Sequence, residues 1–295
     1  MTTSIKSGIV FGICALLMVS SVANGQGKMK TFSANGATLE YMVRGAGEPL
    51  LLIHGAMVAD SFEPIADHLA AAHQLITYRR RGYGGTPPHE VSTISKHAAD
   101  AVALLDHLKI DVAHVGGHSF GAMTALQIAI DSPQRVHSLA LLEPLLPDAA
   151  SASEFGSRIA TVVELYQSGK YRGALERMLS TVGGPDPLPR LNATLSDGWF
   201  EQTLGDFTTS FGADAAAVKA WEFRQENAAT ISKPTLTLVG SETEPIFAET
   251  GQLLSQWLPN AEQYVVDGAT HLLHWEDPEG VAAGLLAFLS RHPMS

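Results

Sequence analysis

The stretch GHSFGA at residues 117–122 places Ser119 two residues from a glycine on either side. The apolar run VAHV at 112–115 comes before it, and AMTALQIAI at 122–130 follows with the composition of a helix. Glycine lets backbone segments approach closely, and G-x-S-x-G between a strand and a helix is typical of a strained turn that exposes a serine hydroxyl. The surrounding sequence therefore predicts that Ser119 is a nucleophile.

Strand-like and helix-like segments alternate on both sides of this turn. A period-two strand is expected at 37–43, and continuous apolar runs typical of strands buried on both faces occur at 49–55, 73–78 and 135–143. Helices are expected at 60–72, 94–108, 120–131 and 278–291. This alternation predicts an α/β fold with a mostly parallel central sheet and helices on both faces.

The alternation breaks at residue 145 and resumes near 231. Residues 145–230 are helical but irregular, with a Pro/Gly break in GGPDPLPRL at 183–191. Strand patterns return in PTLTLVG at 234–240 and AEQYVVDG at 261–268. We therefore expect a core formed by 26–144 and 231–295, with a helical cap inserted at 145–230.

The first 25 residues have the pattern of a secretory signal peptide. A lysine is followed by an apolar stretch and then by the small residues of SVANG at 21–25. Cleavage near 23–26 would make the protein periplasmic or secreted, without membrane attachment; an uncleaved N-terminal anchor is the alternative. Cys14, the single cysteine, lies in this segment, so the mature chain would have no disulfide.

The charge of the chain excludes one class of partner. The formal net charge is -11, and the one basic run is Arg79-Arg80-Arg81. Nucleic-acid binding needs a basic face, so a small-molecule substrate is the expected partner. The oligomeric state is left open.

These motifs resemble those of the α/β-hydrolase superfamily. The resemblance rests on LLIHGA at 51–56, RGYGGT at 81–86, GHSFGA, PTLTLVG and GATHLLHWEDPE at 268–279, in the order typical of the family, and it covers nearly all of the mature chain outside the cap. It implies a helical cap over a serine hydrolase site of the esterase or lactonase type. One departure is Arg79, where many members carry aspartate.

The resemblance also implies roles for individual residues. Ser119 would attack the substrate, and the backbone N–H groups of Ala56 and Phe120 would form the oxyanion hole. His271 would be the base; His274, three residues later, fits the family pattern less well. A metal site at His271, His274 and Glu276 is an alternative, but the spacing lacks the usual i, i+4 pair, and neither a metal nor another cofactor is expected. His54 would be structural, and the other histidines, such as His68, His73, His89, His97, His107 and His292, are expected at the surface.

The acid of the triad has two candidates. Most of the family places it after the strand 234–240, where this chain has Thr243 followed by Glu244. A minority branch takes it from the end of the preceding strand, where Glu143 stands. A carboxylate at a buried strand end needs a partner, which an imidazole N–H provides, so Glu143 is preferred and Glu244 is the alternative.

The expected activity is hydrolysis of a carboxylic ester or lactone of a small, fairly apolar substrate through an acyl-enzyme. Met57, Trp199 and Trp221 are candidates for the walls of the substrate pocket. A non-catalytic binding protein on the same scaffold, a carbon–carbon bond hydrolase and a perhydrolase remain alternatives. The motifs do not choose among acyl bonds.

Overall fold

The computed structural model describes residues 28–86 and 92–294. The predicted signal peptide with Cys14, and the predicted surface residue His89, lie outside these described residues.

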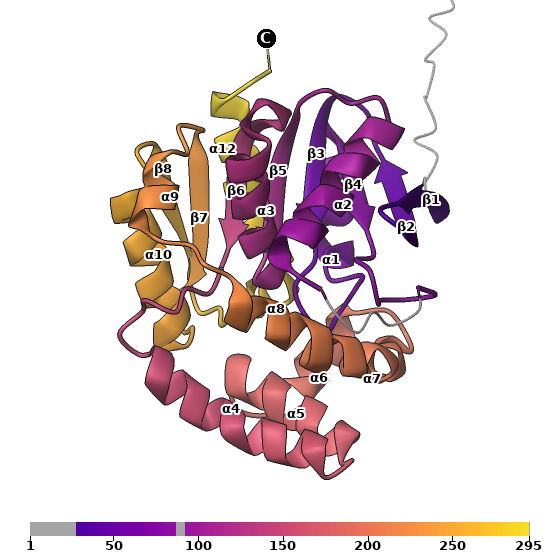
Figure 1. The fold of residues 1–295 in the computed structure, drawn as a ribbon, viewed down its shortest axis with the longest axis vertical. Coiled ribbons are helices and arrows are strands. Elements are labelled where there is room, and N and C mark those ends of the chain that lie inside the picture. Colours follow the sequence, from indigo (N-terminus) through magenta and orange to yellow (C-terminus); the bar gives the residue numbers. More distant parts are fainter. Residues whose placement is uncertain (1–27, 87–91, 295) are drawn as a thin grey trace, which may run out of the picture.

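A single eight-stranded sheet forms the centre of the molecule (Figure 1). Its strand order is β1-β2-β4-β3-β5-β6-β7-β8; β2 is antiparallel to both of its neighbours, and the remaining pairs are parallel. This confirms the predicted α/β fold with a mostly parallel sheet. The strands are β1 (Lys30–Ala34), β2 (Ala37–Arg44), β3 (Glu48–Ile53), β4 (His73–Tyr78), β5 (Ala113–His118), β6 (Val136–Leu142), β7 (Thr235–Gly240) and β8 (Ala261–Val266).

Helices cover both faces of the sheet. One face carries α1 (Glu63–Ala70) and α12 (Pro278–Arg291), which contact each other and bury Ile65, Leu285 and Phe288 against the strands. The other face carries α2 (Ile94–His107), α3 (Phe120–Asp131) and α10 (Pro245–Trp257). Each fully buried leucine or phenylalanine contributes roughly 2–3 kcal/mol. Among residues 28–86 and 92–294, no helix is both long and apolar enough to cross a membrane.

The residues between β6 and β7 gather at the end of the sheet to which β5 and β6 point (Figure 1). The buried apolar side chains of residues 149–207 form a separate cluster that includes Phe155, Leu179 and Phe207 and extends to Phe247 and Trp275 of the core, whereas Trp221 and Phe223 pack in the core cluster. The helices there are α4 (Ala152–Gln167), α5 (Tyr171–Val182), α6 (Leu188–Thr194), α7 (Trp199–Thr209), the π-helical turn η2 (Ser210–Asp214) and α8 (Ala215–Ala220). The last helix before β7, α9 (Gln225–Ala229), lies instead beside the sheet and contacts α10 (Figure 1). The short elements η1 (Pro133–Arg135) and α11 (Leu273–Glu276) complete the described chain.

Candidate active site

Ser119 lies on a sharp turn between β5 and α3. Its φ of 51° and ψ of -116° are strained for a residue with a side chain, and its N–H donates to the carbonyl oxygen of Leu142 at 2.8 Å. A Cβ atom on Gly121 would lie 1.9 Å from the carbonyl oxygen of Ile53, and one on Gly117 would lie 2.3 Å from the carbonyl carbon of Gly121. The two glycines therefore let the chain close around Ser119 and leave its side chain partly exposed.

The backbone N–H groups of Ala56 and Phe120 are available beside Ser119. All three residues line one cavity. Within the described chain, neither N–H donates to a protein acceptor, whereas the next N–H along, that of Met57, donates to the Tyr83 hydroxyl at 3.3 Å. The two free donors are thus the two that the sequence predicted for an oxyanion hole.

Glu143 and His271 are in direct contact. His271 lies in the loop after β8, and its Nδ1 is 2.7 Å from Oε2 of Glu143, which follows β6. The same Oε2 accepts from the Thr243 hydroxyl at 2.8 Å, and Oε1 accepts from the N–H of Gly240 at 2.7 Å. Glu143 is fully buried and has a φ of 46°. Because three donors bind its two carboxylate oxygens, its side chain is held in one position.

Burial shifts the pKa of both Glu143 and His271 so that the uncharged form of each is favoured. It raises the pKa of Glu143, against the opposing hydrogen bonds from Gly240 and Thr243, and it lowers the pKa of His271. The imidazole is therefore neutral at physiological pH. With its proton on Nδ1 facing Glu143, Nε2 carries the lone pair that a general base requires.

Glu244 has a different environment. It is the residue that precedes α10, and its carboxylate forms an ion pair with Arg158 of α4. No contact between Glu244 and His271 occurs among the described residues, whereas Thr243 beside it donates to Glu143. The structure therefore brings Glu143, and not Glu244, to the histidine.

The cavity that Ser119 and His271 share has a volume of about 250 Å³. Met57 lines it, as do the apolar side chains of α4, α5 and α10 that lie over the serine: Phe155, Ile159, Met178, Val182 and Phe247. Asp214 is its one carboxylate, and no Lys or Arg occurs among its described lining residues. The site is apolar and small.

Trp199 and Trp221, predicted as walls of the substrate pocket, are not among the residues that line this cavity. The indole N–H of Trp221 donates to Gln127 at 2.8 Å, and its ring stacks on Phe223 with centroids 5.0 Å apart. The indole N–H of Trp199 donates to Asn192 at 2.9 Å. Each N–H needs a partner when the ring is buried, and these partners direct both rings into packing away from Ser119.

Two residues that sequence reasoning missed contact His271. Phe247 stacks on the imidazole with centroids 3.7 Å apart, and Nε2 of His118 lies 2.9 Å from the carbonyl oxygen of His271. No helix was predicted at 245–257, so nothing pointed to Phe247. The sequence position of His118, directly before the predicted nucleophile Ser119, could have indicated that it lies at the site.

The remaining histidines follow the predictions in part. Nε2 of His54 accepts from the N–H of Arg80 at 2.9 Å, which fits a structural role. His97 and His73 are buried rather than exposed, since His97 packs on Phe120 with ring centroids 5.0 Å apart and His73 lies in β4. In the described segments, no group of three His, Cys, Asp or Glu side chains could hold a metal ion.

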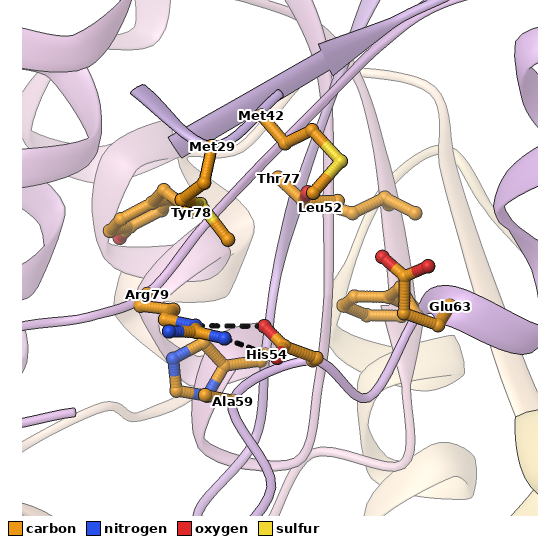
Figure 2. Close-up of a pocket in the computed structure, with 11 residues that line it drawn as sticks. Met29, Met42, Leu52, His54, Ala59, Glu63, Thr77, Tyr78 and Arg79 are labelled. Atoms are coloured by element: carbon orange, nitrogen blue, oxygen red, sulfur yellow. Dashed lines mark hydrogen bonds and ion pairs between the residues drawn. The ribbon is translucent and has the colours of Figure 1, made fainter. Parts of the chain in front are cut away.

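Arg79, which departs from the family pattern, has carboxylate partners of its own. It pairs with Asp60 at 2.6 Å and with Glu40 at 2.9 Å. Arg79 and His54 line a hollow of about 10 Å³ (Figure 2). That hollow has room for about one water molecule and does not include Ser119 or His271. Arg79 is therefore bound to Asp60 and Glu40 and does not line the cavity of Ser119 and His271.

Several known hydrolases are similar to this chain. The chain is 37% identical over 120 residues to the uncharacterized hydrolase YraK of Bacillus subtilis (strain 168), a match that spans 39% of this chain and 44% of that protein. It is 26% identical over 262 residues to 3-oxoadipate enol-lactonase 1 of Acinetobacter baylyi, covering 88% of this chain and 92% of the relative. The solved structure of Est816 as an N-acyl homoserine lactone degrading enzyme superimposes with a TM-score of 0.72 at 25% identity, over 88% of this chain and 100% of that one.

The family assignment rests on the model of the alpha/beta hydrolase fold, which matches residues 48–278. That range runs from β3 to the start of α12 and includes the serine turn, the buried glutamate and the histidine loop. The chain belongs to the α/β-hydrolase family.

Proposed function

We propose that the protein is a serine hydrolase that cleaves a carboxylic ester or lactone of a small, uncharged and mainly apolar substrate. The observation that carries the proposal is the placement of Ser119 and His271 in one apolar cavity, with the Nδ1 of His271 bound to buried Glu143 at 2.7 Å. That arrangement supplies a nucleophile, an oriented base and a dry site.

The reaction follows from the positions of these groups. The Ser119 oxygen forms a bond to the acyl carbon while its proton passes to Nε2 of His271. The carbonyl oxygen becomes an oxyanion between the N–H groups of Ala56 and Phe120. The bond to the leaving oxygen then breaks, and His271 returns the proton to it. Water, deprotonated in turn by His271, releases the acid and restores Ser119.

Glu143 acts through His271 in this scheme. Its carboxylate keeps the proton on Nδ1 and stabilises the imidazolium that forms when Nε2 takes the serine proton. The hydrogen bonds from Gly240 and Thr243 hold the carboxylate in place for that task.

The charge of the cavity favours uncharged substrates. Its carboxylate, Asp214, is paired with Arg80, and no unpaired cation lines the site in the described residues. A substrate with its own carboxylate would bury that charge without a partner, at a penalty of several kcal/mol. The N-acyl homoserine lactone in the description of Est816 is an uncharged lactone, whereas the oxoadipate in the name of the other relative is a carboxylate. A neutral ester or lactone is therefore the preferred class.

A matched pair of substrates tests this proposal. p-Nitrophenyl butyrate and mono-p-nitrophenyl succinate differ mainly in a terminal methyl against a terminal carboxylate. We expect kcat/KM to be on the order of 100-fold higher for the butyrate, with neutral lactones also hydrolysed. A preference for the succinate ester would contradict the neutral substrate class.

Serine chemistry is tested separately with a fluorophosphonate probe and mass spectrometry. Labelling is expected at Ser119 in the wild type and none in Ser119→Ala, which should lose at least about 10³-fold in kcat. Ser61→Ala is the control, because Ser61 is buried but does not line the cavity. Full turnover by Ser119→Ala, or a probe adduct elsewhere, would refute the proposal. An intact site that binds these esters without hydrolysing them would indicate a binding protein.

A further inference from the structure

Arg80 is a fully buried cation beside the loop that follows β3, formed by His54, Gly55 and Ala56 and here called the oxyanion loop. Its side chain is 0% exposed and forms a two-pronged ion pair with Asp214, at 2.6 and 3.1 Å. Burial opposes the charge, but the Asp214 carboxylate raises the pKa of Arg80 above its ordinary value. A permanent positive charge therefore lies inside the protein, and its remaining N–H groups have specific acceptors.

Two of those acceptors are backbone carbonyls of the oxyanion loop. Nη2 of Arg80 donates to the oxygen of Gly55 at 3.0 Å, and Nε donates to that of His54 at 3.2 Å. The His54 ring also holds the Gly55 oxygen, at 2.7 Å from Nδ1. Because a trans peptide is planar, with its C=O and N–H in opposite directions, these bonds also fix the direction of the Ala56 N–H. A cation on the carbonyl further polarises that N–H as a donor.

The second donor is also next to Arg80. The guanidinium carbon lies 4.0 Å from the centre of the Phe120 ring, and His97 packs on the same ring at 5.0 Å. The Phe120 N–H is the other free donor beside Ser119. One buried side chain thus contacts the residues on both sides of the site where the oxyanion would form.

The counterion of Arg80 comes from the cap. Asp214 ends the π-helical turn η2 between α7 and α8, lines the cavity and also accepts from the Tyr83 hydroxyl at 2.7 Å. The preceding cap residue Thr209 donates to the carbonyl of Gly82 at 2.8 Å. Single π-turns inside helices are frequent at functional sites, and here the turn places a carboxylate on the core.

We propose that Arg80 is a positioning residue for the oxyanion hole, and that Asp214 makes this hole depend on the seating of the cap. The inference rests on the proposed serine hydrolase function. With Asp214 in place, Arg80 orients the Gly55–Ala56 peptide and supports Phe120. Without that charge, Arg80 loses its orientation and the Ala56 N–H loses its direction.

A pair of inhibitors separates this role from a structural one. The oxygen of Ser119 adds to the carbonyl carbon of a trifluoromethyl ketone with a short alkyl chain, and the serine proton passes to His271. The resulting hemiketal carries an oxyanion that the oxyanion hole stabilises. The corresponding secondary alcohol fills the same cavity without forming an oxyanion. The variants are Asp214→Asn, Arg80→Met and the double variant Arg80→Met/Asp214→Asn, which leaves no unpaired buried charge and keeps an amide oxygen for Tyr83.

The chain offers a matched control. Arg81 and Asp100 form a second buried two-pronged ion pair, at 2.8 Å for both bonds, whose carboxylate comes from α2 rather than from the cap. Asp100→Asn removes a similar buried pair without touching Gly55 or Phe120. Comparison with it separates loss of stability from loss of the hole.

We expect ketone affinity to fall about 10- to 100-fold in Asp214→Asn and about 100-fold in the other two variants, with alcohol affinity within about threefold throughout. Asp100→Asn, as folded protein, should change neither the ketone affinity nor the alcohol affinity. Recovery of ketone affinity in the double variant, or an equal loss for both inhibitors, would overturn the inference while leaving the proposed function intact. Failure of the wild type to bind the ketone would overturn both.

Discussion

Replacing Glu143 by glutamine tests the hydrogen bonds around its carboxylate. Three donors meet its two oxygens: the Gly240 N–H at Oε1, and the Thr243 hydroxyl and His271 Nδ1 at Oε2. A glutamine amide has only one oxygen. The Gly240 N–H is backbone and cannot turn, so the amide oxygen must face it and the NH₂ group must face Thr243 and His271.

The hydroxyl of Thr243 can rotate to accept, but the imidazole can accept on Nδ1 only by moving its proton to Nε2. That tautomer has no lone pair toward Ser119. We therefore expect kcat to fall by about 10² to 10⁴, or roughly 2.7 to 5.4 kcal/mol in the barrier. The assay is ester hydrolysis by folded protein, with thermal denaturation to verify the fold and ¹⁵N NMR to report the tautomer.

Glu244→Gln is the matched control, since it removes the partner of Arg158 outside the histidine contact. Its kcat is expected to change by less than tenfold, or under about 1.4 kcal/mol. If Glu244→Gln were the more damaging of the two, or if Glu143→Gln kept full activity with His271 protonated on Nδ1, the reasoning would be refuted.

Three further outcomes are expected. Because burial lowers the pKa of His271, the acid limb of kcat/KM should lie below the ordinary histidine value of about 6.5, and a pH–rate profile with its limb at or above pH 7 would show instead that the Glu143 carboxylate outweighs burial. Gly121→Ala should fail to fold or lose over about 3 kcal/mol in urea unfolding, because its Cβ would meet a carbonyl oxygen at 1.9 Å; Gly156→Ala, in α4 with no atom within 4 Å, should be neutral or stabilising by up to about 1 kcal/mol. Exported protein should begin near Asn24 or Gln26, and N-terminal sequencing that starts at Met1 would favour an uncleaved anchor.

The fold was predictable where burial dominates the sequence pattern. The apolar run at 73–78 and the helix at 278–291 match β4 and α12 residue for residue, because β4 is a largely buried apolar run and α12 buries one apolar face. The edge strand β1 was missed, since KTFSA alternates weakly and three of its five residues are exposed. Its pairing with β2 depends on a tight turn at Asn35-Gly36, both at positive φ.

The site was predictable as far as local motifs reach. Ser119 and the Phe120 N–H follow from the serine turn, and the Ala56 N–H follows from the family resemblance of LLIHGA, whereas Glu143 and Glu244 each follow a strand and each precede a proline. Their difference depends on contacts between segments about 100 residues apart, such as Thr243 with Glu143. The positions of the two tryptophans outside the cavity were not predictable for the same reason, because the partner of an indole N–H is set by tertiary packing. The Arg80–Asp214 pair joins positions 134 residues apart and has no local signature.

The contact between Thr243 and Glu143 has a consequence for which strand can carry the acid of the triad. Thr243 occupies the position after β7 where most relatives are expected to carry the acid, and its hydroxyl touches the very oxygen that holds His271. The segments that follow β6 and β7 therefore both bring a side chain to the same place beside His271. A carboxylate at either strand end would therefore stand within reach of the same imidazole, with the serine and the histidine unmoved, even though the two positions look unrelated along the chain.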